Sequence, residues 1–384
     1  KYSILKKKHI FYWSPFLTEI ATTKAVINSV FAINKYDKNY KAYIIDAAGE
    51  FSRKKEEIEK KKIETINLFN FKYIKFLPKY GKILSKLSFL IIFLISFFKL
   101  KKILQYKKPE YLIIHLITSL PLLLFKLFNF KTKCILRISG YPHFGPIRIF
   151  FWRILLRNIY KVTCPTLATY GLIKDLKLVP IDKLFFLPDP IINVSEINML
   201  KSEVVENKFN NYIIAIGRLT KQKNFSFLID IFKKINKNDK DLKLIIFGSG
   251  EEKKSLEKKI SFFSLNKNIQ IFPYTKNIYP YLKNANFFVL SSLWEDPGFV
   301  LLESCFCRTF IISSDCNNGP KEIIKQNKAG LLYETRNETD FLIKYKQFLN
   351  LSQSEITLIK KNALIACKKF TIFNHYREIR KVLN

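Results

Sequence analysis

From residue 212 onward, short apolar runs alternate with amphipathic segments, and this alternation constrains the fold more than any other feature. Apolar runs of strand length occupy residues 212–216, 242–247, 269–272, 285–290 and 309–313. Segments with helical periodicity separate them, at about 224–237, 251–263, 278–284 and 299–307. Strand–helix units joined by short turns predict a parallel sheet with helices on both faces.

The N-terminal half shows the same alternation less regularly. Strands are predicted at residues 8–12, 41–46, 111–116, 133–138 and 161–164, and helices at 22–34, 119–128 and 147–159. The 384 residues exceed what one ordinary core accommodates, so we expect two domains. The whole chain is therefore predicted to be α/β, with two doubly wound domains that meet near residue 192.

Residues 87–98 form the most apolar stretch, and lysines flank it on both sides. Twelve residues are too few to cross a bilayer, which requires about 20. Two interpretations remain open: a core helix of the first domain, or a helix in the interface of an anionic membrane.

The formal net charge of +35 is unevenly distributed. Residues 65–174 contain nineteen Lys and Arg but one acid, Glu110, whereas the part beyond residue 200 mixes both signs. A one-sided basic domain favours an anionic partner. The alternative is a compositional bias towards Lys and Asn that carries no function.

The six cysteines include no CxxC pair, so neither a zinc site nor a disulfide framework is indicated. A reducing compartment fits them best. Residues 1–11 lack an apolar core of signal-peptide length. We therefore expect a cytoplasmic protein.

Two turns follow strands of the second half. The first is Gly217-Arg-Leu-Thr-Lys-Gln-Lys-Asn224, in which Gly217 permits a close approach of the backbone while Arg218 and Lys223 suit a diphosphate. The second is Phe247-Gly-Ser-Gly-Glu251, where Gly248 is a weaker signal of the same kind. An ordinary basic turn and an ordinary tight turn are the alternatives.

A third segment is Ser291-Ser-Leu-Trp-Glu-Asp-Pro-Gly-Phe-Val-Leu-Leu-Glu303. It predicts the end of a buried strand, a loop, and a helix that starts near Phe299. Glu295 on the loop and Glu303 on the helix could accept paired hydrogen bonds from the hydroxyls of a sugar or ribose. The alternative is that both acids face solvent.

Other candidates are weaker. Asp239 and Asp241 have the spacing of a metal-binding pair, but their lysine-rich surroundings favour a solvated loop. His143 lies in a turn-rich loop and could carry protons, whereas His115 is expected to be a satisfied core or surface histidine. Ser14 lies in the loop after the first strand.

The motifs at 217–225, 248, 291–303 and 314–322 together resemble glycosyltransferase family 4, the glycosyl transferases group 1. The resemblance covers most of residues 210–335 and implies a GT-B fold. It implies an acceptor-binding Rossmann-like domain at 1–192, a donor-binding one at 193–362, and a C-terminal helix at 363–384 that returns to the first. The chain departs from the family at Pro273, which leaves the nucleotide base open.

The resemblance implies a retaining transfer that needs neither a metal nor a cofactor besides its nucleotide-sugar co-substrate. Arg218 and Lys223 are expected to neutralise the leaving diphosphate, and Glu295 to face the donor sugar. Glu303 is expected to bind the ribose. The remaining donor-binding positions are expected to be Gly217, Gly248, Gly298, Phe299 and Val300.

We therefore predict a hexosyltransferase acting on a membrane-associated glycan acceptor in lipopolysaccharide, capsule or O-antigen assembly, without a nucleic-acid partner. His143 and Ser14 are the acceptor-side candidates, and the protein is expected at the inner face of the cytoplasmic membrane. A sugar-nucleotide epimerase of the same fold is one alternative. A basic nucleic-acid-binding protein is another, although no binding module is recognisable.

Overall fold

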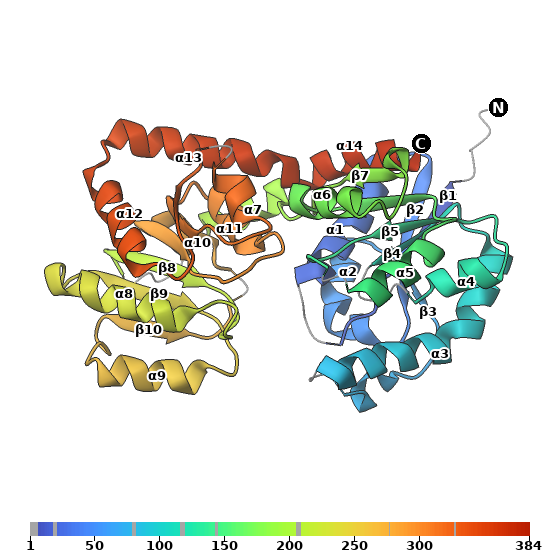
Figure 1. The fold of residues 1–384 in the computed structure, drawn as a ribbon, viewed down its shortest axis with the longest axis horizontal. Coiled ribbons are helices and arrows are strands. Elements are labelled where there is room, and N and C mark those ends of the chain that lie inside the picture. Colours follow the sequence, from blue (N-terminus) through green and yellow to red (C-terminus); the bar gives the residue numbers. More distant parts are fainter. Residues whose placement is uncertain are drawn as a thin grey trace. The chain divides into compact units, whose positions relative to one another are not determined.

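The computed structural model describes residues 7–17, 21–78, 82–115, 120–142, 145–204, 209–275, 277–325 and 328–384. Its internal contacts divide the chain into two compact units (Figure 1). The N-terminal unit comprises residues up to Pro190 together with Ile372–Asn384, and the C-terminal unit comprises Ile191–Thr371. The functional roles predicted for the two domains stay predictions.

The N-terminal unit contains seven parallel strands among its described residues. Their bounds are β1 Lys8–Trp13, β2 Tyr40–Asp46, β3 Thr65–Asn67, β4 Tyr111–His115, β5 Lys133–Arg137, β6 Lys161–Cys164 and β7 Leu184–Phe186. The α-helices are α1 Ala21–Tyr36, α2 Lys55–Lys60, α3 Lys82–Lys107, α4 Leu122–Leu127, α5 Pro146–Leu155, α6 Leu167–Asp175 and α14 Ile372–Leu383.

The C-terminal unit has a six-stranded parallel sheet over its described residues. Its strands are β8 Tyr212–Ile216, β9 Lys243–Phe247, β10 Ile269–Phe272, β11 Phe287–Leu290, β12 Ile311–Ser314 and β13 Leu331–Tyr333. Its α-helices are α7 Val194–Ser202, α8 Phe225–Asn238, α9 Lys253–Phe262, α10 Tyr279–Asn284, α11 Phe299–Phe306, α12 Glu338–Asn350 and α13 Gln353–Cys367.

The strand orders confirm the predicted α/β class with two doubly wound sheets. The first sheet runs β3-β2-β1-β4-β5-β6-β7, and the second runs β10-β9-β8-β11-β12-β13. The order reverses between β1 and β4 and between β8 and β11, and ligands of such sheets bind beyond the strand ends at such a point. In the second sheet, the turns after the neighbouring strands β8, β9 and β11 therefore lie together at the carboxyl ends of the strands.

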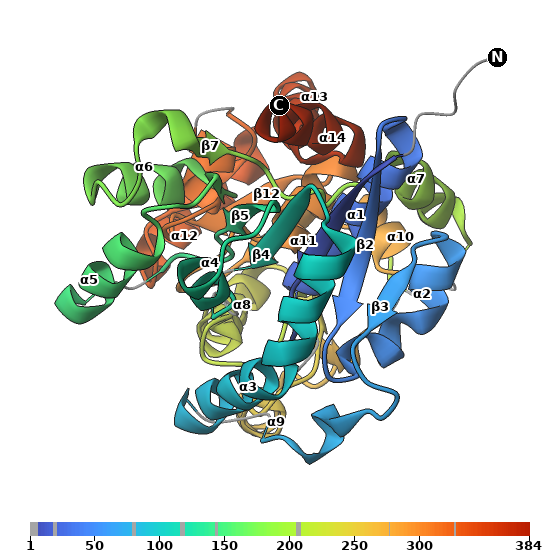
Figure 2. The same cartoon turned by 90° about the vertical axis from the view of Figure 1, so that its right-hand side faces the viewer.

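Helices cover both faces of the first sheet. Helices α3, α4 and α5 lie on one face of this sheet (Figure 2). Their buried side chains, among them Ile92, Leu122 and Trp152, share one core with alternate residues of the strands. Residues of α1 and α14, such as Val26 and Ile379, belong to the core on the other face. The outer sides of α3, α4 and α5 thus belong to one layer of the N-terminal unit.

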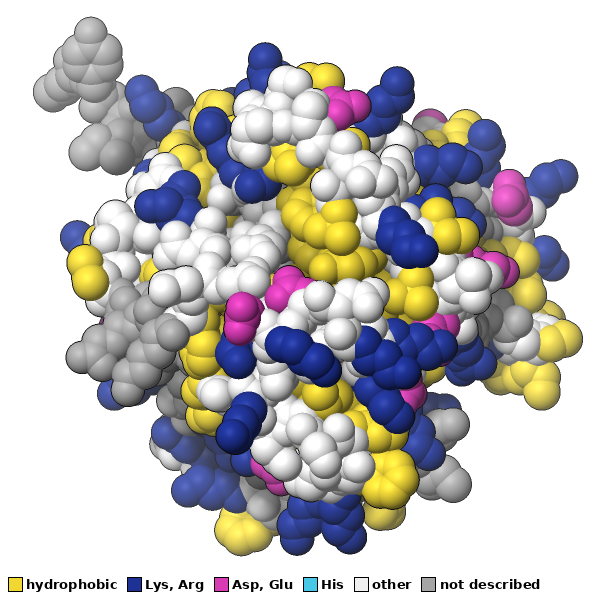
Figure 3. All heavy atoms as spheres, turned by 90° about the vertical axis from the view of Figure 1, so that its left-hand side faces the viewer, with side chains coloured by type: hydrophobic (Ala, Val, Ile, Leu, Met, Phe, Trp, Pro, Cys, Tyr) yellow, Lys and Arg dark blue, Asp and Glu magenta, His cyan; other side chains and the backbone are white. Residues whose placement is uncertain are grey.

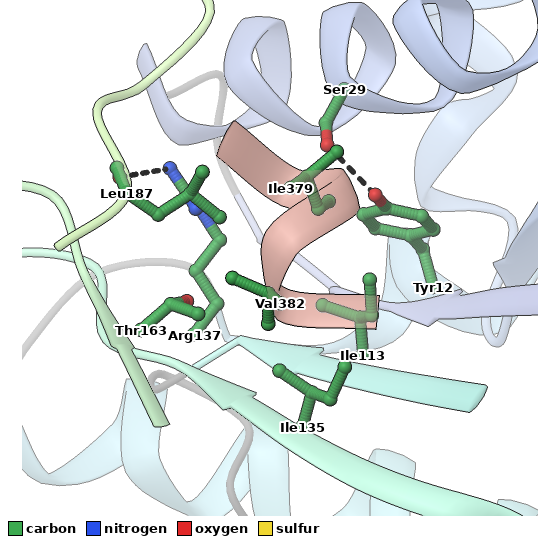
Figure 4. Close-up of a pocket in the computed structure, with 9 residues that line it drawn as sticks. All are labelled: Tyr12, Ser29, Ile113, Ile135, Arg137, Thr163, Leu187, Ile379 and Val382. Atoms are coloured by element: carbon green, nitrogen blue, oxygen red, sulfur yellow. Dashed lines mark hydrogen bonds between the residues drawn. The ribbon is translucent and has the colours of Figure 1, made fainter. Parts of the chain in front are cut away.

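The last helix, α14, packs into the N-terminal unit through apolar and polar contacts. Ile379 and Val382 border a small cavity beside Arg137 (Figure 4). His375 is fully buried, and its ring bonds to the Ser29 hydroxyl at 2.7 Å and to the Pro188 carbonyl at 2.8 Å. Burial, with a smaller contribution from the charge of Arg137, lowers the pKa of His375 to about 3.

The apolar stretch predicted as a short helix at 87–98 lies within α3, which has 26 residues. The flanking lysines extend the helix because lysine favours helix formation and its ammonium can remain in water. Lys101, for example, places its Nζ 3.8 Å from the ring centroid of Phe128. No helix in the described part of the chain is both long and apolar enough to span a bilayer.

Helices α6, α7 and α12 lie where the sequence predicts no helix, and α2 lies in a charged segment, 53–64, that fits a helix or a loop. Side-chain caps support two of them: Thr166 accepts from the Thr169 amide at the start of α6, and Asn337 accepts from the Asp340 amide at the start of α12. The sequence from 355 to 384 predicts two helices, and they are present as α13 and α14. Only α14 joins the N-terminal unit, whereas α13, which overlaps the start of the returning helix expected at 363–384, belongs to the C-terminal unit.

Candidate active site

The turns after β8 and β9 pack directly against each other. The Gly217 amide donates to the Phe247 carbonyl at 3.0 Å, and the Gly248 amide donates to the Phe272 carbonyl at 2.9 Å. A Cβ atom on Gly248 would lie 1.9 Å from the Gly217 carbonyl oxygen, which no real contact allows. Glycine at 248 is therefore required by the approach of two backbones, and the weak sequence signal has a definite structural cause.

The turn that carries Arg218 and Lys223 bonds to the loop that follows β11. The Ser291 hydroxyl donates to the Lys223 carbonyl at 2.7 Å, and the Leu293 amide donates to the Gln222 carbonyl at 2.8 Å. The two motifs, identified separately in the sequence, are thus joined directly by hydrogen bonds. Asn224 ends the turn in the left-handed region, with φ of 54°, immediately before α8.

Lys223 and Glu295 form a direct ion pair, with 2.5 Å between Nζ and Oε1. The side chains of Lys223 and Glu295 are 15% and 5% exposed, so both charges are largely withdrawn from water. The Ser292 hydroxyl donates to the same Oε1 atom at 2.5 Å. This arrangement overturns the alternative in which the loop acid faces solvent.

Arg218 is the exposed cation of the pair predicted for the diphosphate. Its Nη2 donates to Gln222 Oε1 at 3.2 Å, and Gln222 Nε2 donates to the Trp294 carbonyl at 2.9 Å. Gln222 therefore connects Arg218 to the loop that carries Glu295. The guanidinium remains at the surface beside the ion pair, where it could reach an anionic ligand.

Glu303 lies in the second turn of α11 and is buried, which again excludes an acid facing solvent. The Tyr279 hydroxyl donates to Glu303 Oε1 at 3.2 Å. Tyr279 was not among the expected site residues, because α10 carries no recognised motif. Gly298 is the N-cap residue of α11, with φ of 93°. The first amides of the helix, at Phe299 and Val300, have no intrahelical acceptors because no helical turn precedes them.

The loop after β12 supports the site and was not assigned residue roles from the sequence. Asn318 Nδ2 donates to the Glu295 carbonyl at 3.2 Å and bonds to the Asp296 carboxylate. A Cβ on Gly319, whose φ is 140°, would lie 2.0 Å from the Pro297 carbonyl oxygen. The Asn-Gly pair at 318–319 can be recognised in the sequence as a turn, but its contacts with the loop that carries Glu295 and Pro297 cannot.

The candidates of the N-terminal unit are less clearly assembled. Ser14 is buried just after β1, and His143 lies outside the described residues. His115 is buried and bonds to the Ser139 hydroxyl at 3.0 Å, and burial holds its pKa well below the usual range. His115 is thus the core histidine that the sequence favoured.

The aspartate pair has a structural role in a turn. Asp239 Oδ1 accepts hydrogen bonds from the amides of Asp241 and Leu242 at 3.2 and 3.0 Å. Among the described residues, no cluster of three or more His, Cys, Asp or Glu has an arrangement that could hold a metal ion.

Comparison with known proteins defines the class. Residues 197–364 match the model of the family described as glycosyl transferases group 1. The C-terminal unit is therefore a group 1 glycosyltransferase domain, and the family recognised from the sequence is confirmed.

Individual relatives agree with this class. An uncharacterized glycosyltransferase of Methanocaldococcus jannaschii is 30% identical over 252 residues, 59% of this chain and 61% of that protein. For the next two relatives, the chain spans only 35% and 38% of their length. A Campylobacter jejuni α-1,4-N-acetyl-D-galactosaminyltransferase, named for a diNAcBac-PP-undecaprenol glycan, is 28% identical over 82% of this chain and 83% of its own.

Solved structures extend the likeness to the whole chain. The crystal structure of a glycosyltransferase from Rickettsia africae covers 98% of both chains with a TM-score of 0.76 at 15% identity. At that identity the likeness shows the fold alone. With the two doubly wound units, it confirms the GT-B fold.

Proposed function

We propose that this protein transfers a hexose from a nucleotide-diphosphate sugar to a lipid-linked glycan acceptor, with retention of configuration and without a metal ion. The observation that carries the proposal is the joined turn and loop that place Arg218, Lys223 and Glu295 at one sheet edge. The Campylobacter relative, which covers most of the chain, supports the lipid-linked acceptor.

The proposed chemistry relies on charge that develops on the leaving diphosphate. Arg218 and Lys223 stabilise that charge, and the loop contacts hold both side chains near it before the ligand binds. The amides at the start of α11 add partial positive charge toward the phosphate. Glu295 is then available to orient the sugar, since a bound diphosphate competes for the ammonium of Lys223.

The proposed membrane association rests on the N-terminal unit. The outer sides of α3 and α5 expose large apolar side chains: Leu84, Leu87, Leu90, Leu94, Ile95 and Phe98 on α3, and Ile147, Phe150, Phe151 and Ile154 on α5. Apolar groups of this size exposed beside many cations and one acid suit an anionic bilayer surface. Assembly of lipopolysaccharide, capsule or O-antigen at the inner face of the cytoplasmic membrane would place the acceptor there.

A panel of nucleotide sugars tests this function with an undecaprenyl-diphosphate glycan as acceptor. One donor is expected to give a glycosylated lipid product whose new linkage has the donor's anomeric configuration by NMR. Activity is expected to persist in EDTA. Release of free nucleotide without a glycosylated product, or an inverted linkage, would contradict the proposal.

A further inference from the structure

A groove of about 510 Å³ opens at the edge of the N-terminal unit where β5 and β6 begin. Its volume lies in the range of small-molecule sites. Lys133 and Lys161, the first residues of β5 and β6, line it. Ser14, in contrast, follows the last residue of β1. The groove therefore lies at the amino ends of the parallel strands and the predicted acceptor residue at their carboxyl ends.

One wall of the groove is apolar and continues onto the exposed helix surface. Phe125, Phe128 and Phe130 line it, with ring centroids 5.2 Å apart for Phe125–Phe130 and 6.2 Å for Phe128–Phe130. The Phe128 ring also contacts Phe97 of α3 at 6.3 Å. Beside these rings, Phe98 of α3 is 76% exposed. Ring contacts through Phe97 thus link the phenylalanines of the groove to Phe98 on the apolar face proposed for the membrane.

The other wall is cationic. Lys131, Lys133, Lys161 and Lys183 line the groove against one acid, Asp182. The ammonium groups of Lys133 and Lys161 each lie 5.0 Å from the ring centroid of Tyr160, which gathers two like charges around one ring. Glu110 already pairs with Lys133, with 3.4 Å between Oε1 and Nζ, so an anion in the groove would bind to Lys131, Lys161 and Lys183.

The lysines keep donors for such an anion. Lys161 Nζ donates to the Val382 carbonyl at 2.9 Å, and Lys183 Nζ donates to the Ile159 carbonyl at 3.1 Å. Each ammonium has three N–H donors, so these backbone bonds fix its position while leaving capacity for a ligand. Lys131 is exposed at the rim of the groove.

We propose that this basic groove binds the headgroup phosphate of an anionic phospholipid, whose acyl chains run along the phenylalanine wall toward α3. The lysines supply the compact charges that bind phosphate, and the rings supply an apolar surface at the depth of the acyl chains. This is a second lipid site beyond the proposed transfer reaction, because it does not involve the sugar acceptor.

Vesicle binding by matched charge variants tests the site. We expect Lys131→Gln with Lys183→Gln to weaken binding to phosphatidylcholine–phosphatidylglycerol vesicles about thirtyfold, because each lysine near an anionic surface contributes about 1 kcal/mol. The control pair, Lys60→Gln with Lys174→Gln, removes two exposed lysines of the same unit outside the groove. Equal losses in both pairs would overturn the proposal.

A site-specific probe separates a lipid from a soluble phosphate. The six native cysteines are buried, so a dye will label Lys131→Cys or the control Lys174→Cys selectively. Phosphatidylglycerol vesicles are expected to shift the emission of the dye at 131 and not at 174. An equal shift with glycerol phosphate alone would assign the groove to a soluble phosphate and overturn the lipid assignment.

Failure of this proposal can be told apart from failure of the proposed transferase. The glutamine pair at 131 and 183 is expected to bind nucleotide diphosphates as the unaltered protein does, measured by calorimetry. If this double variant still binds vesicles as the original protein does and its turnover is normal, the lipid-binding groove is contradicted and the proposed transferase function is not.

Discussion

The two units share a doubly wound parallel sheet but differ in where their charges lie. The C-terminal unit mixes Lys and Arg with Asp and Glu on its surface, as the face on the side of α8, α9 and α12 shows (Figure 3). The N-terminal unit has nineteen cations against one acid between residues 65 and 174, and exposes the apolar sides of α3 and α5. One fold therefore presents two different surfaces.

Buried charges also serve different purposes in the two units. In the C-terminal unit, Lys223 and Glu295 are paired on turns at the strand ends, where ligands of such sheets bind. In the N-terminal unit, Arg137 pairs with Asp189 beside His375, next to residues of α14. The first pair lies where the proposed donor site is, whereas the second lies in the interior of the N-terminal unit near α14.

The largest effect is expected at Glu295. Glu295→Gln keeps the size of the side chain but removes the charge that faces Lys223, and we expect kcat to fall about 10²- to 10³-fold, as for loss of one preorganised electrostatic group. The control is Glu251→Gln, which alters an exposed acid in the turn after β9. Turnover within threefold of the original, with an unchanged melting temperature, would argue against the site.

Glu303 tests whether α11 binds the donor as well as supporting the loop. Glu303→Gln should raise the donor Kd ten- to hundredfold, because a hydrogen bond to a charged group contributes about 1.5–3 kcal/mol. Calorimetry with the preferred donor measures this directly. The exposed Glu257→Gln on α9 serves as the control, and equal affinities for the two variants would remove Glu303 from the site.

His375 tests the structural role of the buried polar groups in the N-terminal unit. Its pKa is about 3 in the folded state and about 6.5 in an unfolded chain, so below pH 6.5 protonation favours unfolding. When the pH is lowered from 7 to 5, the free energy of unfolding of the original protein should fall by about 2 kcal/mol more than that of the His375→Gln variant.

Glutamine is polar and does not titrate between pH 5 and pH 7, so the variant removes the titration of residue 375 while keeping a group that can form hydrogen bonds. His115 and Glu50 are present in both proteins. Burial is the largest cause of the lowered pKa of His115 and of the raised pKa of Glu50, so their contributions largely cancel in the difference. Urea unfolding at pH 7 and pH 5, followed by tryptophan fluorescence in a Trp294→Phe background, reports on Trp13 and Trp152 of this unit. An identical pH dependence in the two proteins would contradict the lowered pKa.

The smallest effect is expected for vesicle binding when exposed phenylalanines are replaced, and Phe98 and Phe262 compare the surfaces of the two units directly. These phenylalanines are 76% and 83% exposed, on α3 of one unit and α9 of the other. Phe98→Ser should weaken binding to anionic vesicles about tenfold, because full burial of such a ring contributes about 1.5–3 kcal/mol and a membrane interface buries it only in part. Phe262→Ser should leave vesicle binding unchanged. A larger loss for Phe262→Ser than for Phe98→Ser would place the membrane surface on the C-terminal unit and contradict the proposal.

The sequence predicted much of the C-terminal site because local patterns encode it. Strand runs, the glycines at 217 and 248, and the acids at 295 and 303 are all short-range signals. The bonds from Tyr279 and Asn318 join segments that are far apart in sequence, so no local pattern reveals them. The ion pair between Lys223 and Glu295 likewise depends on two turns meeting across neighbouring strands.

In the N-terminal unit, local patterns predicted less. Helix α3 runs past its apolar stretch through lysines that favour helix formation, and tertiary packing adds the contact of Lys101 with the Phe128 ring. His375 is an ordinary residue of the C-terminal segment in sequence, and only the packing of α14 makes it a buried partner of Ser29. The acceptor candidates Ser14 and His143 stay predictions.

Binding of nucleotide diphosphates by calorimetry tests the central claim most directly, namely that the joined turn and loop of the C-terminal unit bind the diphosphate of the donor. For the nucleotide that binds best, Arg218→Ala with Lys223→Ala is expected to weaken binding at least a hundredfold, while Lys221→Ala in the same turn changes it less than threefold. Equal affinity in the double variant and the original protein would contradict the account.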